Sequence, residues 1–285
     1  MEKFGPMIRE LRLSKGLTLN ELAKDIVSVP FLSKYERGGS DISVAHFFQL
    51  MDRLNVRFSE FEVANLVSEQ EKQDAFLEKY SYAVNNDNII LLRQLLTDEK
   101  QYYQQNSNVR HVHNQIILKQ YIHNLSQLPY DQEGIKVIKD YLMKVEDWHL
   151  YEIELFGNSI FFLPLATSEF LVKTAIKKTY LMDKISNNKH VLAQVIANVI
   201  TRMIEADELM KARQLIELGK RQLTHTKFYY EKTYLHFFEG YCLLKEGKEL
   251  GENYCQQAID VMKTLKDYET ANHLTAYLDE HGFKL

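Results

Sequence analysis

Apolar residues recur at three- and four-residue spacing along almost the whole chain. Sustained alternation of apolar and polar residues, which is typical of half-buried β-strands, is nearly absent. Only 4 prolines and 11 glycines interrupt the 285 residues, so the pattern predicts one helix after another. We therefore expect an all-α protein.

Residues 1–66 carry the start signals of several short helices. Thr18 and Glu21 form a capping box, in which each side chain can bond a backbone amide of the other residue. Ser28 and Ser43 can cap two further helices, since their hydroxyl groups accept hydrogen bonds from free amides of a first turn. These signals predict a compact domain of short helices.

The same region carries helix ends and a set of apolar stripes. Gly16 and Gly38 can end helices in the left-handed conformation, and a second capping box at residues 59–62 predicts a fifth helix. The residues expected to share the core are Phe4, Ile8, Leu11, Leu19, Leu22, Ala23, Ile26, Leu32, Tyr35, Phe47, Leu50, Met51 and Leu54. A small five-helix domain is the expected result.

One face of the third predicted helix is suited to DNA. Pro30, Ser33, Lys34 and Arg37 follow one another at helical spacing, opposite the expected core residues, and such a face can enter a major groove. Residues 1–66 contain nine Lys and Arg and nine Asp and Glu, and the whole chain has a net charge of −4. DNA binding would therefore depend on a local basic face and on dimerisation.

Residues 5–38 resemble the lambda-repressor-like (XRE) helix-turn-helix. The matching positions are Gly5, Ile8, Arg9, Leu11, Arg12, Lys15, Gly16, Leu17, Thr18, Glu21, Leu22, Ala23, Ser28 and Leu32 to Gly38. The resemblance implies a domain that binds double-stranded DNA. The residues assigned to the DNA-binding face are Ser28, Pro30, Ser33, Lys34, Arg37 and Lys15.

The same resemblance implies an internal ion pair between Arg12 and Glu36, which braces the first helix against the recognition helix. A phosphate contact by Arg12 is the alternative. The sequence departs from the family at residues 29–31, Val-Pro-Phe, where relatives commonly present polar residues to base edges. Apolar contact with thymine methyl groups, or readout of DNA shape, is expected there. A folded relic or a protein-binding module is the other interpretation of this domain.

Residues 67–285 are expected to form a helical-repeat domain. About eleven amphipathic segments follow a linker helix placed near residues 66–72. The predicted breaks include residues 85–88, 127–131, 186–189 and 245–253. Tyr234 to Leu265 carries residues of a tetratricopeptide-like unit, namely Gly240, Tyr241, Gly247, Tyr254 and Ala258. A TPR-like α-solenoid explains this pattern best.

The order and length of the two domains resemble the Rgg/GadR/MutR regulators, relatives of the peptide-sensing RRNPP group. The stretch from Trp148 to Asn158, with its aromatic residues, supports the resemblance. The resemblance implies a homodimer formed through the C-terminal domain, which binds an inverted repeat in promoters. It also implies that a short peptide pheromone binds on the concave face of the solenoid, and RNA polymerase is a further candidate partner.

An extended peptide exposes backbone amides, which an asparagine side chain can clamp because it both donates and accepts hydrogen bonds. The candidate peptide-binding residues are Asn158, Tyr151, Gln194, Asn198 and Arg202, the last three in a polar stripe that also holds Thr201 and Glu205. The alternative is that the stripe is a solvated helix face and that Asn158 bonds a neighbouring helix end.

Other chemistry finds little support in the sequence. His111, His113 and His123 lack the spacing of a metal site, and the two cysteines, Cys242 and Cys255, are expected to be buried and reduced. Paired aromatic residues such as Tyr102-Tyr103 are assigned to packing and to a dimer contact. We find no P-loop, GxGxxG, GxSxG or HExxH motif, so neither an enzyme nor a cofactor is expected.

The apolar stretches are too short to cross a bilayer, and the first residues are too charged for a signal peptide. We therefore expect a cytoplasmic protein without membrane contact. The function that these features favour is a homodimeric transcription regulator controlled by a short peptide. The alternative is a helical scaffold that docks a protein partner and is localised by its DNA-binding domain.

Overall fold

The structure is a computed structural model that describes residues 4–58, 69–178, 186–223 and 228–284. The described residues form helices and connecting turns, and none of them lies in a strand. The chain divides by its contacts into two compact units, Met1–Tyr82 and Ala83–Leu285. The boundary predicted between residues 66 and 67 lies outside the described residues and stays a prediction.

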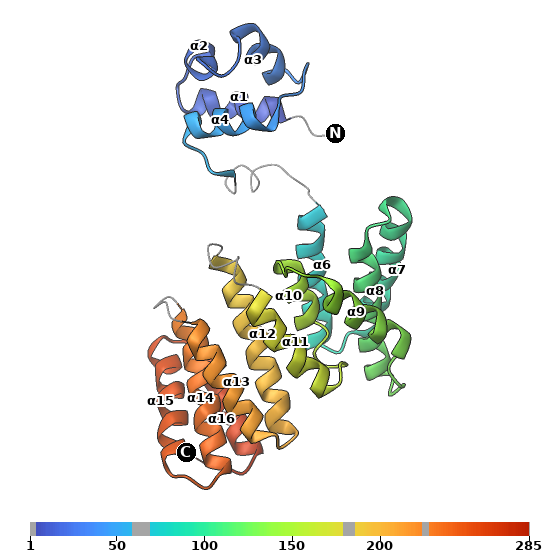
Figure 1. The fold of residues 1–285 in the computed structure, drawn as a ribbon, viewed down its shortest axis with the longest axis vertical. Helices are drawn as coiled ribbons and strands as arrows, with labels where there is room; N and C mark the ends of the chain where they lie inside the picture. The colour runs from blue at the N-terminus through green and yellow to red at the C-terminus, as the bar shows by residue number, and fades with distance from the viewer. Residues whose placement is uncertain (1–3, 59–68, 179–185, 224–227, 285) are drawn as a thin grey trace. The chain divides into compact units, whose positions relative to one another are not determined.

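Among its described residues, the first unit contains a cluster of four short helices and the start of a longer one (Figure 1). The helices are α1 (Phe4–Ser14), α2 (Leu19–Ala23), α3 (Val29–Glu36), α4 (Val44–Leu54) and α6 (Glu69–Asn85), the last of which ends in the second unit. The capping box at residues 59–62 and its fifth helix lie outside the described residues.

The caps that begin α2, α3 and α4 are those that the sequence predicts. Thr18 accepts from the Glu21 amide, and the Glu21 carboxylate accepts from the Thr18 amide at 2.7 Å. The Ser28 hydroxyl accepts from the Phe31 amide at 3.3 Å, and Ser43 caps α4 in the same way. The predictions for these three helix starts are confirmed.

The core of the first unit joins all four short helices. It consists of Ile8, Leu22, Ala23, Leu32, Tyr35, Phe47, Leu50, Met51 and Leu54, with Leu11, Leu19 and Ile26 packed at its edge. Phe4 differs from the prediction, because it is exposed, although its ring lies beside the buried Phe47 ring, with the two centroids 6.0 Å apart.

The second unit is a succession of antiparallel helices, each packed against its neighbours (Figure 1). After α6 come α7 (Ile89–Asn106), α8 (Val109–Leu125), α9 (Gln132–Lys144), α10 (Leu150–Gly157), α11 (Leu165–Lys178), α12 (Ser186–Glu205), α13 (Leu209–Gln222), α14 (Tyr229–Lys245), α15 (Leu250–Thr264) and α16 (Tyr268–Glu280). The all-α, helical-repeat architecture is thus the one that the sequence predicts.

The helix breaks predicted at residues 85–88 and 127–131 are close to the observed ones, whereas the break at residues 186–189 is wrong. Those residues form the first turn of α12, which begins at Ser186. Serine and asparagine favour turns, but the same side chains also suit the first turn of a helix, where amides lack partners. Composition alone therefore cannot tell the two structures apart.

The predicted tetratricopeptide-like unit is the closely packed pair of α14 and α15. A Cβ atom built on Gly240 would lie 2.8 Å from the Tyr254 Cβ, and one on Gly251 would lie 2.6 Å from the Gly240 carbonyl oxygen. The two backbones therefore approach at a distance that only glycine allows. The Cys255 thiol lies in this contact and donates to the Phe237 carbonyl oxygen at 3.6 Å.

A cluster of polar side chains is buried where α8 meets α7 and α10. The Glu99 carboxylate bonds His111 at 2.7 Å and accepts from the Asn114 amide at 3.1 Å. His113 bonds the Tyr151 hydroxyl at 2.6 Å. Burial lowers the pKa of His113 to about 4, so its imidazole is neutral near pH 7.

This burial predicts a pH-dependent stability of the second unit. The pKa of His113 falls from 6.5 to about 4 on folding, so its contribution is complete above pH 6.5 and is lost as the pH falls towards 4. Between pH 6.5 and pH 4 we expect the unfolding free energy of the wild type to fall by up to about 3 kcal/mol more than that of the His113→Gln variant. Denaturant titrations followed by fluorescence of the buried Trp148 measure it.

A matched control is His273→Gln, which removes an exposed histidine of α16. It should leave the pH dependence of the wild type unchanged. Equal pH dependence of the wild type and His113→Gln would contradict the assignment.

Candidate nucleic-acid interface and ligand pocket

Helix α3 is held by contacts from both α1 and α2. Its attachment to α1 depends on Gly5. A Cβ atom on Gly5 would lie 1.8 Å from the carbonyl oxygen of Tyr35, well inside any allowed separation. The absence of a side chain at Gly5 therefore lets the backbone of α1 touch the last turn of α3.

A buried ion pair fixes the same contact. Arg12 Nε donates to Glu36 Oε1 at 2.7 Å, and its Nη2 donates to Oε2 at 2.8 Å, so the pair is bidentate. Arg12 Nη1 also donates to the Leu17 carbonyl oxygen. Arg12 is 7% exposed and Glu36 is 3% exposed. This geometry gives Arg12 a bracing role and leaves its guanidinium turned away from solvent, where a phosphate would lie.

The candidate DNA-binding residues lie on the outer side of this brace. Pro30, Lys34 and Arg37 are exposed, Ser33 is half-buried, Ser28 is the exposed cap of α3, and Lys15 is exposed directly after α1. Arg37 Nε donates to the Ser33 carbonyl oxygen at 3.1 Å, which orients its guanidinium along the helix. The face thus presents three cations, Lys15, Lys34 and Arg37, beside small polar groups, a combination suited to contacts with DNA.

The departure from the family at residues 29–31 has a structural reason. Val29 and Phe31 are partly buried and pack against the core, while Pro30 is exposed in the first turn of α3. Two of the three apolar residues therefore hold the helix, and only Pro30 is offered to a ligand.

Arg53 is a supporting residue that the sequence analysis did not identify. Its Nη1 donates to the Leu22 carbonyl oxygen at 3.2 Å and also bonds the Lys24 carbonyl oxygen. It thereby satisfies the free carbonyl groups at the end of α2. The signal for it is weak, because its partner carbonyls lie about thirty residues earlier in the chain.

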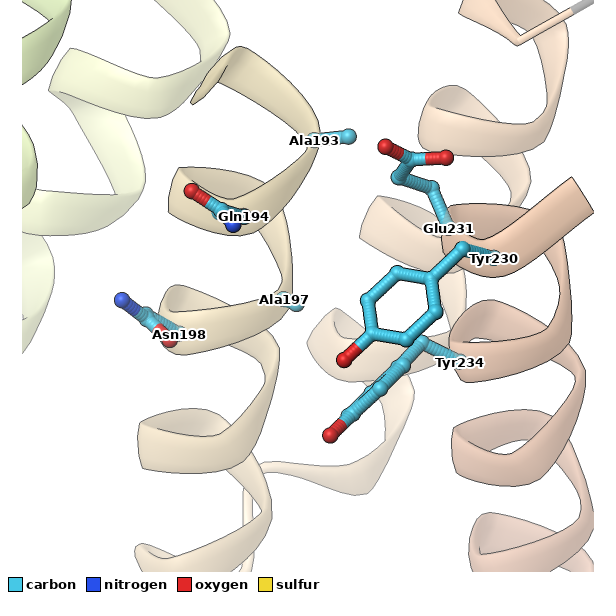
Figure 2. A pocket seen from close by; sticks show the side chains of 7 residues that line it. All are labelled: Ala193, Gln194, Ala197, Asn198, Tyr230, Glu231 and Tyr234. Atoms are coloured by element: carbon cyan, nitrogen blue, oxygen red, sulfur yellow. The ribbon is translucent and has the colours of Figure 1, made fainter. Parts of the chain in front are cut away.

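A pocket of about 270 Å³ lies between α12 and α14 in the second unit (Figure 2). Its lining residues are Ala193, Gln194, Ala197, Asn198, Tyr230, Glu231 and Tyr234. The small side chains of α12 face the two tyrosine rings of α14, which leaves the space between the helices. Gln194 and Asn198 are exposed and bring amide groups to the α12 side.

The structure brings together only two of the five candidate peptide-binding residues. Gln194 and Asn198 line the pocket. Tyr151 instead bonds His113, and the Arg110 guanidinium lies over the Tyr151 ring, 5.2 Å from the centre of that ring. Asn158 donates to the Glu154 carbonyl oxygen of its own helix at 2.9 Å.

Arg202 is likewise hydrogen-bonded within the fold. Its Nη1 bonds the carbonyl oxygens of Ile160 and Leu163, the latter at 2.8 Å, and so satisfies the turn between α10 and α11. One residue of the polar stripe on α12 is therefore engaged in a contact within the fold and is not available to a peptide as the sequence suggests.

Five of the seven lining residues were not predicted: Ala193 and Ala197 of α12, and Tyr230, Glu231 and Tyr234 of α14. Tyr230, as part of the Tyr229-Tyr230 pair, was assigned to packing, which is the commoner role of paired aromatic residues on a helix, and Tyr234 was placed only at the start of the tetratricopeptide-like unit. No feature of the sequence distinguishes the buried Glu231 from other glutamates, since its position depends on how α14 packs against α12.

The described part of the chain offers neither a metal site nor a membrane-spanning helix. No group of three or more His, Cys, Asp or Glu side chains lies there in an arrangement that could hold a metal ion. None of the helices in the same residues is both long and apolar enough to span a membrane.

Comparison with protein families matches both units. Residues 8–61 match a helix-turn-helix family, and residues 93–276 match the C-terminal domain of the HTH-type transcriptional regulator Rgg. The second match spans more than half of the chain. The chain belongs to the Rgg family. The prediction of an Rgg-type regulator with an XRE-like N-terminal domain is thereby confirmed.

Solved structures share this fold over nearly the full length of the chain. The Streptococcus dysgalactiae SHP pheromone receptor Rgg2 is 25% identical, with a TM-score of 0.83 over 98% of this chain and 99% of that chain. A putative transcriptional regulator from Listeria monocytogenes is 21% identical, with a TM-score of 0.85 and 99% coverage of both chains.

ComR from S. thermophilus, solved with DNA and its signalling peptide ComS, is 14% identical, with a TM-score of 0.60 over 98% of this chain and 100% of that chain. At that identity the match shows the fold alone. The Rgg family consists of transcription regulators, so this Rgg chain is a DNA-binding regulator and not an enzyme.

Proposed function

We propose that this Rgg chain is a cytoplasmic homodimer that binds inverted repeats in promoters through α3 and responds to a short signalling peptide. The peptide binds the helical-repeat unit at the pocket between α12 and α14. Its binding changes the geometry of the dimer or its contacts with RNA polymerase.

The observation that supports this function best is the exposed face of α3, which a buried ion pair holds in place from the inner side. Lys34 and Arg37 lie outside, while Arg12 and Glu36 fix the helix from within. A rigid support of this kind favours recognition of a specific sequence, because base contacts need fixed side-chain positions. The similarity to a pheromone receptor and the amide-lined pocket support a peptide as the effector.

Replacing Lys34 or Arg37 with alanine is expected to weaken operator binding about 10- to 100-fold without unfolding the protein, since each loses a contact with a base or a phosphate. Fluorescence anisotropy with DNA from upstream of the gene and its neighbours measures the affinity. Lys263→Ala, which removes an exposed charge from α15, is the charge-matched control and should bind as the wild type. If both α3 variants bind the operator with unchanged affinity, the assignment of the exposed face of α3 to DNA binding is wrong.

The response to peptides is tested with the same DNA. Short peptides encoded near the gene are added one at a time, and the DNA affinity and the transcription from the bound promoter are measured. One peptide that changes either quantity supports the proposed effector. Specific DNA binding with no response to any peptide contradicts that part of the function.

A further inference from the structure

The pocket between α12 and α14 contains a carboxylate that its surroundings do not satisfy. Glu231 is 8% exposed, and its Oε1 bonds the His190 imidazole. Its other oxygen, Oε2, is buried and has no hydrogen-bond partner. A carboxylate has about four acceptor sites, and burial without donors costs free energy. A donor that entered the pocket would remove this cost.

The position of this group makes it available to a ligand. Figure 2 shows the Glu231 carboxylate between the two helices, beside the small side chain of Ala193. Oε2 is shielded from solvent, but the terminal torsion of a glutamate is broad, so a small rotation turns this oxygen towards a ligand.

The rest of the wall suits a cation. Tyr230 and Tyr234 lie one helical turn apart, with ring centres separated by 5.1 Å. The faces of aromatic rings attract ammonium and guanidinium groups, and the attraction grows when water is excluded. Gln194 and Asn198 offer amide groups that can bond a peptide backbone.

We infer that this pocket holds a positively charged group of the peptide, an ammonium or guanidinium, against Glu231 and the two tyrosine rings. The group comes either from the amino terminus or from a lysine or arginine side chain. A pocket of about 270 Å³ takes one such group with its neighbouring residue, and not a whole peptide. The inference rests on the proposed function and names the chemistry of its ligand.

The test uses the full-length protein and a synthetic pool of heptapeptides composed of Leu, Ile, Val, Phe and Gly. Each peptide is made with a free amino terminus, with an acetylated terminus, and with an acetylated terminus and one internal lysine. Affinity selection followed by mass spectrometry gives the retention of each form.

We expect at least one cationic form to be retained about tenfold or more over its neutral acetylated partner, which is the usual strength of a charge-assisted hydrogen bond. The form that is retained identifies the source of the charge. In Glu231→Gln, which keeps an oxygen for His190 and removes the charge, the preference should fall close to unity.

Glu239→Gln is the matched control. It makes the same change on α14, where Glu239 pairs with Lys220 outside the pocket, and it should keep the preference of the wild type. Melting temperatures of both variants show whether the fold is intact.

The outcomes separate this inference from the proposed function. Peptides retained without regard to charge, or a preference that persists in Glu231→Gln, overturn the inference and leave a peptide-responsive regulator. Retention of no peptide in any form overturns both.

Discussion

Gly5→Ala is expected to release the recognition helix and to abolish specific DNA binding. The new Cβ would lie 1.8 Å from the Tyr35 carbonyl oxygen and 2.7 Å from its carbonyl carbon, and backbone atoms cannot turn aside as a side chain does. Alanine gains about 1 kcal/mol in helix propensity, but we expect the clash to cost about 3 kcal/mol or more, so the clash decides the result.

Hydrogen exchange of the amides in residues 4–54 measures this effect, because α1 and α3 belong to the cooperative unit that the clash disrupts. Gly39→Ala is the matched control. Its Cβ would lie 3.2 Å from the Lys34 Cγ, on a flexible side chain, and 3.3 Å from the Lys34 carbonyl oxygen, so a cost below about 1 kcal/mol is expected. Wild-type exchange rates in Gly5→Ala would contradict the close contact.

Arg12→Met is expected to destabilise the first unit by about 3–5 kcal/mol, because it leaves the Glu36 carboxylate buried without its cation. Methionine fills much of the volume of arginine, so the loss reports mainly on charge. The Leu17 carbonyl oxygen also loses its donor. Hydrogen exchange of residues 4–54 again gives the change in unfolding free energy, and operator affinity shows whether α3 remains in place.

A double-mutant cycle separates the pair from the packing around it. Glu36→Leu alone leaves the guanidinium unpaired, while Arg12→Met together with Glu36→Leu leaves no buried charge. The double variant should therefore be more stable than the sum of the two single losses predicts.

Lys173→Met is the control for an exposed ion pair. Lys173 and Glu169 lie 2.6 Å apart, with the lysine side chain 44% exposed, and such pairs contribute less than about 1 kcal/mol. A loss for Arg12→Met no larger than that of Lys173→Met would show that the buried pair does not brace the fold.

Much of the local structure could be predicted because its causes lie within a few residues. The caps at Thr18, Ser28 and Ser43 depend on a side chain and an amide three residues later. Spacing alone also placed Pro30, Lys34 and Arg37 on one exposed face of α3. The wrong break at residues 186–189 shows the limit, since the same polar residues suit a turn and a first helical turn.

The candidate effector pocket could be predicted only in part. Gln194 and Asn198 stand out as polar residues in an apolar helix, and both line the pocket. Arg202 belongs to the same sequence stripe, yet it bonds the turn between α10 and α11, about forty residues earlier in the chain. A helical pattern shows which residues share a face, but not which neighbour covers each part of that face.

The sequence by itself determined the all-α architecture, the starts of α2, α3 and α4 and the exposed candidate face of α3, because hydrophobic periodicity and capping act over one or two turns. Only the tertiary structure decided that Gly5 must lack a side chain and that Glu231 faces a pocket with an unsatisfied oxygen. These features arise where α1 meets α3 and where α12 meets α14. Contacts between segments far apart in the chain leave no periodic trace in either one.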